Sequence, residues 1–244
     1  MSATVQLSIN LPAPKAKRGG KRKNAGRKAT RRGTWVGHKA RAWHDANHPV
    51  HVTLRVRRGV PSLRGYGLAK TVTESLRRAA QSNDVGPAAR RRTFRVVHYS
   101  IQSNHLHLIV EATSKVALAR GMQGLASVLA RRVNRTLRRR GSLFGDRYHA
   151  HALASPTEVR NAVVYVLKNF EKHPEPIPDL GTAPTAGIDP LSSARWFTGW
   201  AQPPPDSPLT PPVANPRTWL LGTGWKRAGL VARHERPAGT LGLD

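Results

Sequence analysis

The sequence of 244 residues contains no cysteine. This absence excludes disulfides, thiolate metal sites and cysteine nucleophiles, and it fits a reducing compartment. A bound metal ion would therefore need histidine, carboxylate or amide ligands. The sequence also lacks any apolar run near the roughly 20 residues of a membrane-spanning helix. At the N-terminus the apolar stretch precedes the charged residues, which reverses the order of a secretory signal. We expect a soluble protein of the cytoplasm, associated with the nucleoid.

Acidic residues are scarce in this chain. It has 13 of them against 41 lysines and arginines, which gives a formal net charge of +28 and an isoelectric point near 11.8. Such an excess opposes compaction unless a polyanion neutralises it. The basic segments lack the apolar face of a helix that lies on a membrane surface. The composition therefore predicts nucleic acid as the partner and no membrane association.

Composition divides the chain into three parts. Residues 1–47 form an arm rich in Lys, Arg, Gly and Ala, and such a segment buries too little surface to offset its ordering entropy. Residues 174–244 are rich in proline, so we expect an irregular C-terminal tail. Its tryptophans, which include Trp200 and Trp225, indicate that parts of the tail dock on the protein, because disordered segments are usually poor in aromatics. Residues 48–173 remain as the folded domain, of a size that one core can support.

Periodicity predicts the elements of this domain. Alternating and β-branched patterns indicate four strands, and apolar residues three or four positions apart indicate three helices. The expected strands lie within 48–57, 93–102, 105–112 and 143–153, and the expected helices lie within 68–81, 116–140 and 155–173. The last helix has the clearest start, because Ser155, Pro156 and Glu158 match an N-cap, a first helical position and a capping box. The order predicts an α+β, ferredoxin-like (split βαβ) antiparallel sheet with helices on one face, plus an added C-terminal helix.

One histidine pair is notable for its place on a strand. His105 and His107 flank Leu106, so both imidazoles point to one face of the sheet while Leu106 points to the other. Two imidazoles on an open face are natural ligands for a divalent ion, Mg²⁺ or Mn²⁺, and nitrogen ligands favour Mn²⁺. Chance also produces such pairs, because the chain has eleven histidines, and His149 and His151 form a second pair. Spacing alone leaves a metal role open for both pairs.

Tyr165 is a candidate nucleophile. It stands four residues before Asn169 on the last predicted helix, so the two side chains lie on one helical face. A nucleophile and an amide ligand could therefore face one centre. The alternative is a half-buried helix tyrosine whose hydroxyl finds a partner. Tyr99 and Tyr148 are rival nucleophiles, but both lie on predicted strands, where we expect roles in the core or in a groove wall.

These motifs together resemble a known family. The run IQSNHLHLIVEA, the basic helix after it, the segment GSLFGDRYHAHAL and the helix NAVVYVLKN resemble the HUH single-tyrosine transposases, in particular their REP-associated tyrosine transposase branch. The resemblance spans about residues 48–173. It implies that His105 and His107 bind the metal ion, that Asn169 completes the metal shell, and that Tyr165 attacks the phosphorus. The family's helix often continues through Asn-Pro, whereas Phe170 follows Asn169 here.

The resemblance implies a metal-dependent enzyme that nicks and rejoins single-stranded DNA near hairpins through a 5′-phosphotyrosine. We expect the basic arm and six arginines to bind the DNA phosphates, although each arginine alone could be a solvated surface charge. The six are Arg131, Arg132, Arg135, Arg138, Arg139 and Arg147. Two other functions stay open, a replication initiator or relaxase and a nucleic-acid-binding protein with an inert centre. Family members are often dimers, so a homodimer, with the tyrosine acting in cis or in trans, is also left open.

Overall fold

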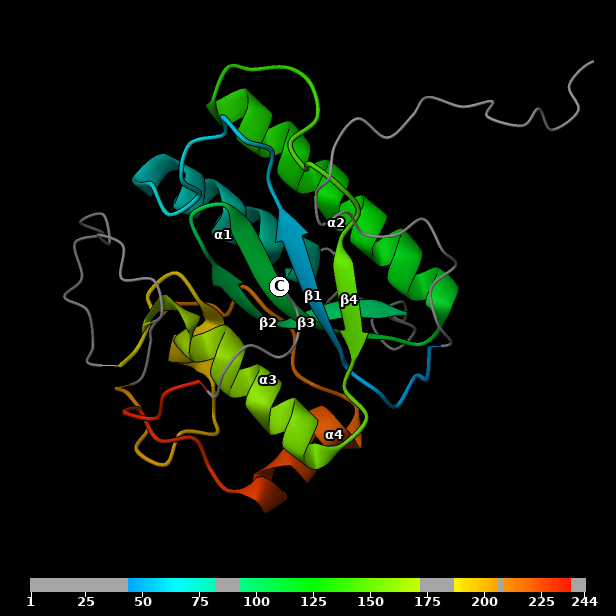
Figure 1. The fold of residues 1–244 in the computed structure, drawn as a ribbon, viewed down its shortest axis with the longest axis vertical. Helices are drawn as coiled ribbons and strands as arrows, with labels where there is room; N and C mark the ends of the chain where they lie inside the picture. The colour runs from blue at the N-terminus through cyan, green and yellow to red at the C-terminus, as the bar shows by residue number, and fades with distance from the viewer. Residues whose placement is uncertain (1–43, 82–92, 172–186, 206–208, 238–244) are drawn as a thin grey trace, which may run out of the picture. The chain divides into compact units, whose positions relative to one another are not determined.

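A computed structural model describes residues 44–81, 93–171, 187–205 and 209–237 of the chain. Its centre is a four-stranded antiparallel sheet with the strand order β2-β3-β1-β4 (Figure 1). The strands are β1 (Val50–Arg55), β2 (Phe94–Ile101), β3 (His105–Ala112) and β4 (His149–Ala152). The α-helices are α1 (Tyr66–Gln81), α2 (Lys115–Thr136), α3 (Pro156–Lys168) and the short α4 (Trp219–Gly222). Three 3₁₀ turns are η2 (Asn169–Glu171), η3 (Ser193–Trp196) and η4 (Gly224–Ala228).

The order of these elements confirms the predicted ferredoxin-like fold. A strand, a helix, two strands, a helix and a strand follow one another along the chain, and the strand order is that of a split βαβ sheet. Helices α1 and α2 cover one face of the sheet, and the added helix α3 covers the other (Figure 1). No helix among the described residues is both long and apolar enough to cross a membrane.

Alternation along the strands separates two hydrophobic cores. Leu106, Leu108 and Val110 of β3 pack under α1 and α2, as predicted. Ile109, which points to the opposite face, packs instead with apolar residues of α3. Because neighbouring residues of a strand point to opposite faces, the even positions of β3 serve one core and the odd positions face α3. The histidines at 105 and 107 therefore lie on the α3 side.

Helix α3 begins where the sequence predicted. The Ser155 hydroxyl accepts a hydrogen bond from the Glu158 N–H at 3.2 Å, and the Glu158 carboxylate accepts one from the Ser155 N–H at 3.1 Å. This is a capping box with proline at the first helical position. The helix ends at Lys168 and continues as η2 to Glu171, so its predicted last two residues lie outside the described ones. The helix start fixes how far along the sheet Tyr165 lies.

Helix α2 is shorter than predicted. Apolar spacing continues to Leu137 and predicted a helix to Arg140, but the helix ends at Thr136 and Arg138 has a φ of +48°. The N–H of Arg138 donates to the Arg135 carbonyl at 3.1 Å, and the N–H of Arg139 donates to the Asn134 carbonyl at 2.9 Å. These two bonds form a Schellman cap, which usually has glycine at the left-handed position. Arginine favours helix, so the sequence carried no stop signal, and Arg138 and Arg139 lie beyond the helix.

The described part of the C-terminal tail shares a core with α3. Phe197, Trp200 and Trp225 are buried there together with Val159 and Val163 of the helix. A buried ion pair adds a polar link to the rest of the fold: the Arg64 guanidinium donates two hydrogen bonds, of 3.0 and 3.1 Å, to the carboxylate of Asp189. Although the tail contains short helical turns and loops, the boundary predicted at residue 173 does not separate two packing units. Residues 1–43 of the predicted arm lie outside the described residues.

Candidate active site

The sheet face beneath α3 carries a row of polar side chains. His51, Thr53 and Arg55 alternate along β1, and His105 and His107 alternate along β3. In the register of the two strands, Thr53 lies opposite His107 and Arg55 lies opposite His105. Residues directly opposite each other in a ladder have side chains on the same face. The pair therefore lies among polar residues of β1, and the histidines share one face as predicted.

The two imidazoles of the pair face each other through their Nε2 atoms. These atoms are 2.9 Å apart. The Nδ1 atom of His105 is 2.7 Å from the Asn104 Oδ1, and the Nδ1 atom of His107 is 3.2 Å from both the His51 Nε2 and the Thr53 Oγ1. A metal-binding histidine typically uses one ring nitrogen for the ion and holds the other through a hydrogen bond. The observed arrangement fits that requirement, because the Nδ1 atom of each ring has a polar neighbour and the two Nε2 atoms face each other.

Burial favours the neutral form of His107 and of His51. It lowers the pKa of His107 well below its usual value, and the neighbouring His105 and His51 lower it further. Burial also lowers the pKa of His51 to about 3, with smaller contributions from His151, His149 and His105. Neutral imidazole is the form that binds metal ions. Among the described residues, no three His, Cys, Asp or Glu side chains form a group that could hold an ion.

Helix α3 brings Tyr165 to this cluster. The centre of the phenol ring is 5.0 Å from that of His107 and 5.8 Å from that of His51, with the rings at 79° and 74°. Tyr165 is half-buried, which also fits the alternative of a helix tyrosine without a catalytic role. Its ring neighbours, however, are the imidazoles of His51 and His107. Asn169 lies one turn later, at the C-cap of α3, and is 2% exposed. Its role as a metal ligand stays a prediction.

The rival tyrosines lie elsewhere. Tyr99 is fully buried in the core beneath α1 and α2, on the other side of the sheet. Burial raises the pKa of its hydroxyl, which makes ionisation and attack harder. Tyr148 packs against the same core from the loop before β4. Neither tyrosine shares the face that carries the histidine pair, whereas Tyr165 lies against His107 on that face.

Sequence reasoning missed three neighbours of the pair, namely His51, Thr53 and Arg55. Their alternation in HVTLR was a usable signal, since positions 51, 53 and 55 must share a face. The second His-x-His pair also belongs to this region, because His149 lies opposite Thr53 and His151 lies opposite His51. Both of these histidines are exposed on β4, an edge strand. Five imidazoles therefore gather on one half of the sheet.

The arginines predicted to bind DNA are not beside the histidine pair. Arg131, Arg132 and Arg135 lie on the last turns of α2, which covers the opposite face of the sheet. Beyond the helix, Arg139 donates to the Asn134 side chain at 3.0 Å and to the Ser142 carbonyl at 3.2 Å, and Arg138 is exposed. The structure therefore gives these five arginines a surface separate from the candidate active site.

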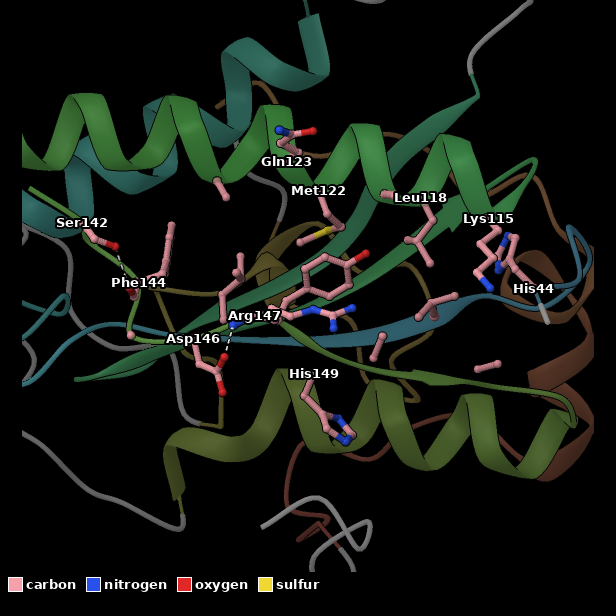
Figure 2. Close-up of a pocket in the computed structure, with 18 residues that line it drawn as sticks. His44, Lys115, Leu118, Met122, Gln123, Ser142, Phe144, Asp146, Arg147 and His149 are labelled. Carbon is pink, nitrogen blue, oxygen red and sulfur yellow. Dashed lines mark hydrogen bonds between the residues drawn. The ribbon is translucent and has the colours of Figure 1, made fainter. Parts of the chain in front are cut away.

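Arg147, the sixth of them, lines a pocket of about 960 Å³ between α2 and β4. Figure 2 shows Leu118 and Met122 of α2 above this pocket and Phe144 at one end. His149 points away from α2 and toward α3 in the same view (Figure 2). Strand β4 therefore separates the pocket from the histidine face, and Arg147 lies two residues before that strand.

Comparisons with known proteins identify a family and a similar solved structure. Residues 47–169, half of the chain, match the family model described as "Transposase IS200 like". A solved structure of a REP-associated tyrosine transposase bound to a REP hairpin is similar at 17% identity, with a TM-score of 0.40; the match covers 57% of this chain and 74% of that one. No curated protein matches the chain. The segment matched by the family model begins before β1 and ends at Asn169, so it contains the histidine pair and Tyr165.

Proposed function

This chain belongs to the IS200-like transposase family, and from that premise we propose that it nicks and rejoins single-stranded DNA, with Tyr165 as the nucleophile. The observation that carries the proposal is the position of the Tyr165 ring, whose centre is 5.0 Å from that of the His107 ring. His107 in turn faces His105 through the Nε2 atoms of the two rings. The excess of 41 basic over 13 acidic residues supports a nucleic acid as substrate. We propose hairpin-containing DNA as the site of cleavage, which is what the family resemblance implies.

We further propose His105, His107 and Asn169 as the ligands of a divalent ion, Mg²⁺ or Mn²⁺. The bound ion would supply positive charge at the scissile phosphate and make its phosphorus easier to attack. Asn104 and Thr53 contact the Nδ1 atoms of the two rings and would leave the Nε2 atoms to bind the ion. Nitrogen ligands favour Mn²⁺ over Mg²⁺.

The strand transfer follows from the chemistry of a phenol. Its pKa of about 10 in model compounds makes it a weak nucleophile at neutral pH, so placement beside the phosphate matters. Tyr165 Oη would form a bond to phosphorus and lose its proton, and the bond from phosphorus to the 3′ oxygen would break. The products are a 5′-phosphotyrosine and a free 3′-hydroxyl. Attack by a 3′-hydroxyl of a second strand reverses these steps, so rejoining needs no nucleotide cofactor.

Arg55 is a candidate for binding the phosphate next to the cleaved bond. It is exposed at the end of β1, opposite His105 in the ladder. Its charge reaches the pair, because it contributes to the lowered pKa of His107. A guanidinium on the same face as the nucleophile can hold a phosphate by two parallel hydrogen bonds. The five arginines around the end of α2 would bind the DNA further away.

A labelled hairpin oligonucleotide tests the proposal. With the label at the 3′ end, a 5′-phosphotyrosine leaves the labelled fragment attached to the protein as a slow band on a denaturing gel. We expect this band with Mn²⁺ and not with a chelator, and we expect Tyr165→Phe to abolish it. Tyr148→Phe is the matched control and should keep it. A band that persists in Tyr165→Phe would assign the nucleophile elsewhere, and binding without adduct under any metal would identify a non-catalytic nucleic-acid-binding protein.

A further inference from the structure

The tail contains one tryptophan that packing does not explain. Trp219, the first residue of α4, is 51% exposed, whereas Trp200 and Trp225 in the same tail are 3% and 2% exposed. Helix α4, orange in Figure 1, lies beside α3 and outside the segment that matches the family model. Tryptophan is enriched at binding interfaces, where its ring packs on one partner and its N–H stays close to water. The family assignment gives this residue no role.

The indole of Trp219 is nevertheless held in place. A Cβ atom added at Gly224 would come within 2.7 Å of the ring, so the ring lies directly against the backbone of η4. The guanidinium carbon of Arg227 lies 4.9 Å from the ring centre, a cation–π contact. Residues three apart eclipse each other in a 3₁₀ helix, so Gly224 and Arg227 lie on the same side of η4, and both contact the indole. The Trp219 side chain nevertheless remains 51% exposed.

The surroundings of this indole are positively charged. Residues 209–237 contain five lysines and arginines and one acidic residue, Glu235. Glu235 is paired with the Arg160 guanidinium at 2.7 Å. The nearby Glu111 is buried, and its carboxylate accepts the backbone N–H groups of Arg217 and Thr218 at 2.8 to 3.0 Å. Arg217, Lys226 and Arg227 themselves are exposed. The exposed charge beside the ring is therefore cationic.

We propose that Trp219 is a stacking platform for an unpaired base of single-stranded DNA, and that Arg217, Lys226 and Arg227 bind the phosphates next to that base. An anchored aromatic ring among cations is suited to a strand that offers bases and phosphates together. A base within a duplex is already stacked and cannot reach the platform. The inference rests on the proposed function only for the choice of ligand, since it concerns binding away from Tyr165.

The test is a fluorescence anisotropy titration of the full chain with a labelled 20-mer of oligothymidine, in chelator, so that no cleavage chemistry contributes. We expect Trp219→Leu to weaken binding about 5-fold to 100-fold, as for loss of one stacked base. Trp219→Tyr should restore most of the affinity. Gly224→Ala, which displaces the ring without removing it, should also weaken binding. Arg236→Ala, an exposed arginine of the same tail, is the control and should change it less.

Two further readouts separate stacking from a structural role. Trp219→Leu should leave the affinity for a blunt duplex and the salt dependence unchanged. The double change of Lys226 and Arg227 to alanine should instead reduce the slope of log affinity against log salt by about 0.7 for each lost contact. The fluorescence of a 2-aminopurine base in the oligonucleotide should be quenched when it binds the wild-type protein. This quenching should be lost when the same oligonucleotide binds Trp219→Leu.

Several results would overturn the platform. They are an unchanged single-strand affinity in Trp219→Leu, an equal loss for duplex, a loss confined to RNA of the same sequence, or an affinity loss in Trp219→Tyr despite an unchanged melting temperature. If the wild-type protein bound no single-stranded DNA, the proposed function itself would be refuted. A protein that binds and responds to Trp219→Leu but forms no adduct would keep the platform and refute the chemistry.

Discussion

His107 has its two ring nitrogens in different settings. Its Nε2 atom faces His105, while its Nδ1 atom lies 3.2 Å from both the His51 Nε2 and the Thr53 Oγ1. His51 is 1% exposed and touches Tyr165 at its edge. Groups that hold the outer nitrogen of a metal-binding histidine fix its tautomer and its orientation. His51 and Thr53 would therefore be the positioning residues for the ion proposed there.

This arrangement gives a prediction about metal affinity. Replacing a residue that orients a ligand typically costs about 10-fold to 100-fold in metal affinity, and we expect losses of this size for His51→Ala and smaller ones for Thr53→Val. Mn²⁺ binding to the full chain can be followed by electron paramagnetic resonance, without DNA. His151→Ala, which removes an exposed imidazole from the edge strand, is the control. Equal Mn²⁺ affinity in His51→Ala and wild type would remove the positioning role.

Individual site residues were partly predictable. Local patterns of alternation and helical spacing made His105, His107 and Tyr165 candidates, and the family resemblance selected them from the alternatives. Alternation in β1 could group His51 with Thr53 and Arg55 on one face, but it could not show the contact with His107, since no local pattern states how β1 and β3 pair. The arginines show a second limit of local patterns. Their number predicted DNA binding, but the sequence could not show that five of them lie on the far side of the sheet.

At the scale of elements, the buried side chain of His98 connects β2 to the tail through its contacts. Its Nδ1 atom lies 3.2 Å from the Ser193 hydroxyl, its ring meets Phe197 edge-on, and burial lowers its pKa to about 4. In the unfolded chain the same group titrates at about 6.5. Between these values the unfolded state binds more protons, so stability falls as the pH falls. The stability lost in this way is about 3 kcal/mol once the pH has fallen to the folded-state pKa of His98.

A non-titrating variant isolates this contribution. We expect the free energy of unfolding of His98→Gln to vary less between pH 7 and pH 4 than that of wild type. The slope of this free energy against pH should differ between the two proteins by the equivalent of up to one bound proton. Denaturant unfolding at a series of pH values measures it, and the comparison cancels the other buried histidines. Equal slopes in the two proteins would mean that His98 is charged or solvated in the folded state.

Elements were predicted well where one local signal decides them. The capping box at Ser155 and the alternation in β3 are such signals, and both elements begin as predicted. The end of α2 was predicted too late because its cap depends on Arg138 in a left-handed conformation, which costs about 1 to 2 kcal/mol for a residue other than glycine. Propensity alone cannot anticipate a conformation that the surrounding chain imposes.

On the scale of the whole molecule, the tail is part of the fold that positions Tyr165. Trp225, Phe197 and Trp200 fill the second core, which α3 shares with the sheet. Proline content predicted an irregular tail, but it could not show that this tail completes the second core. Trp225→Ala should therefore cost about 3 to 5 kcal/mol of stability, as for other buried tryptophans. Thermal and denaturant unfolding measure this loss, with the exposed Trp219→Ala as the comparison. Similar losses in the two variants would contradict the core assignment.

The arrangement of the active site within one chain makes a last prediction. Tyr165 approaches His107 of its own chain, with ring centres 5.0 Å apart, so we expect catalysis in cis. A homodimer that exchanges α3 would instead pair each tyrosine with the histidines of its partner. Mixing His107→Ala with Tyr165→Phe distinguishes the two cases, because only exchange can rebuild one complete site from two defective chains. In the cis arrangement the mixture forms no adduct, and wild-type protein added to the same mixture restores it. Adduct in the mixture of the two variants, carried by the His107→Ala chain, would establish exchange.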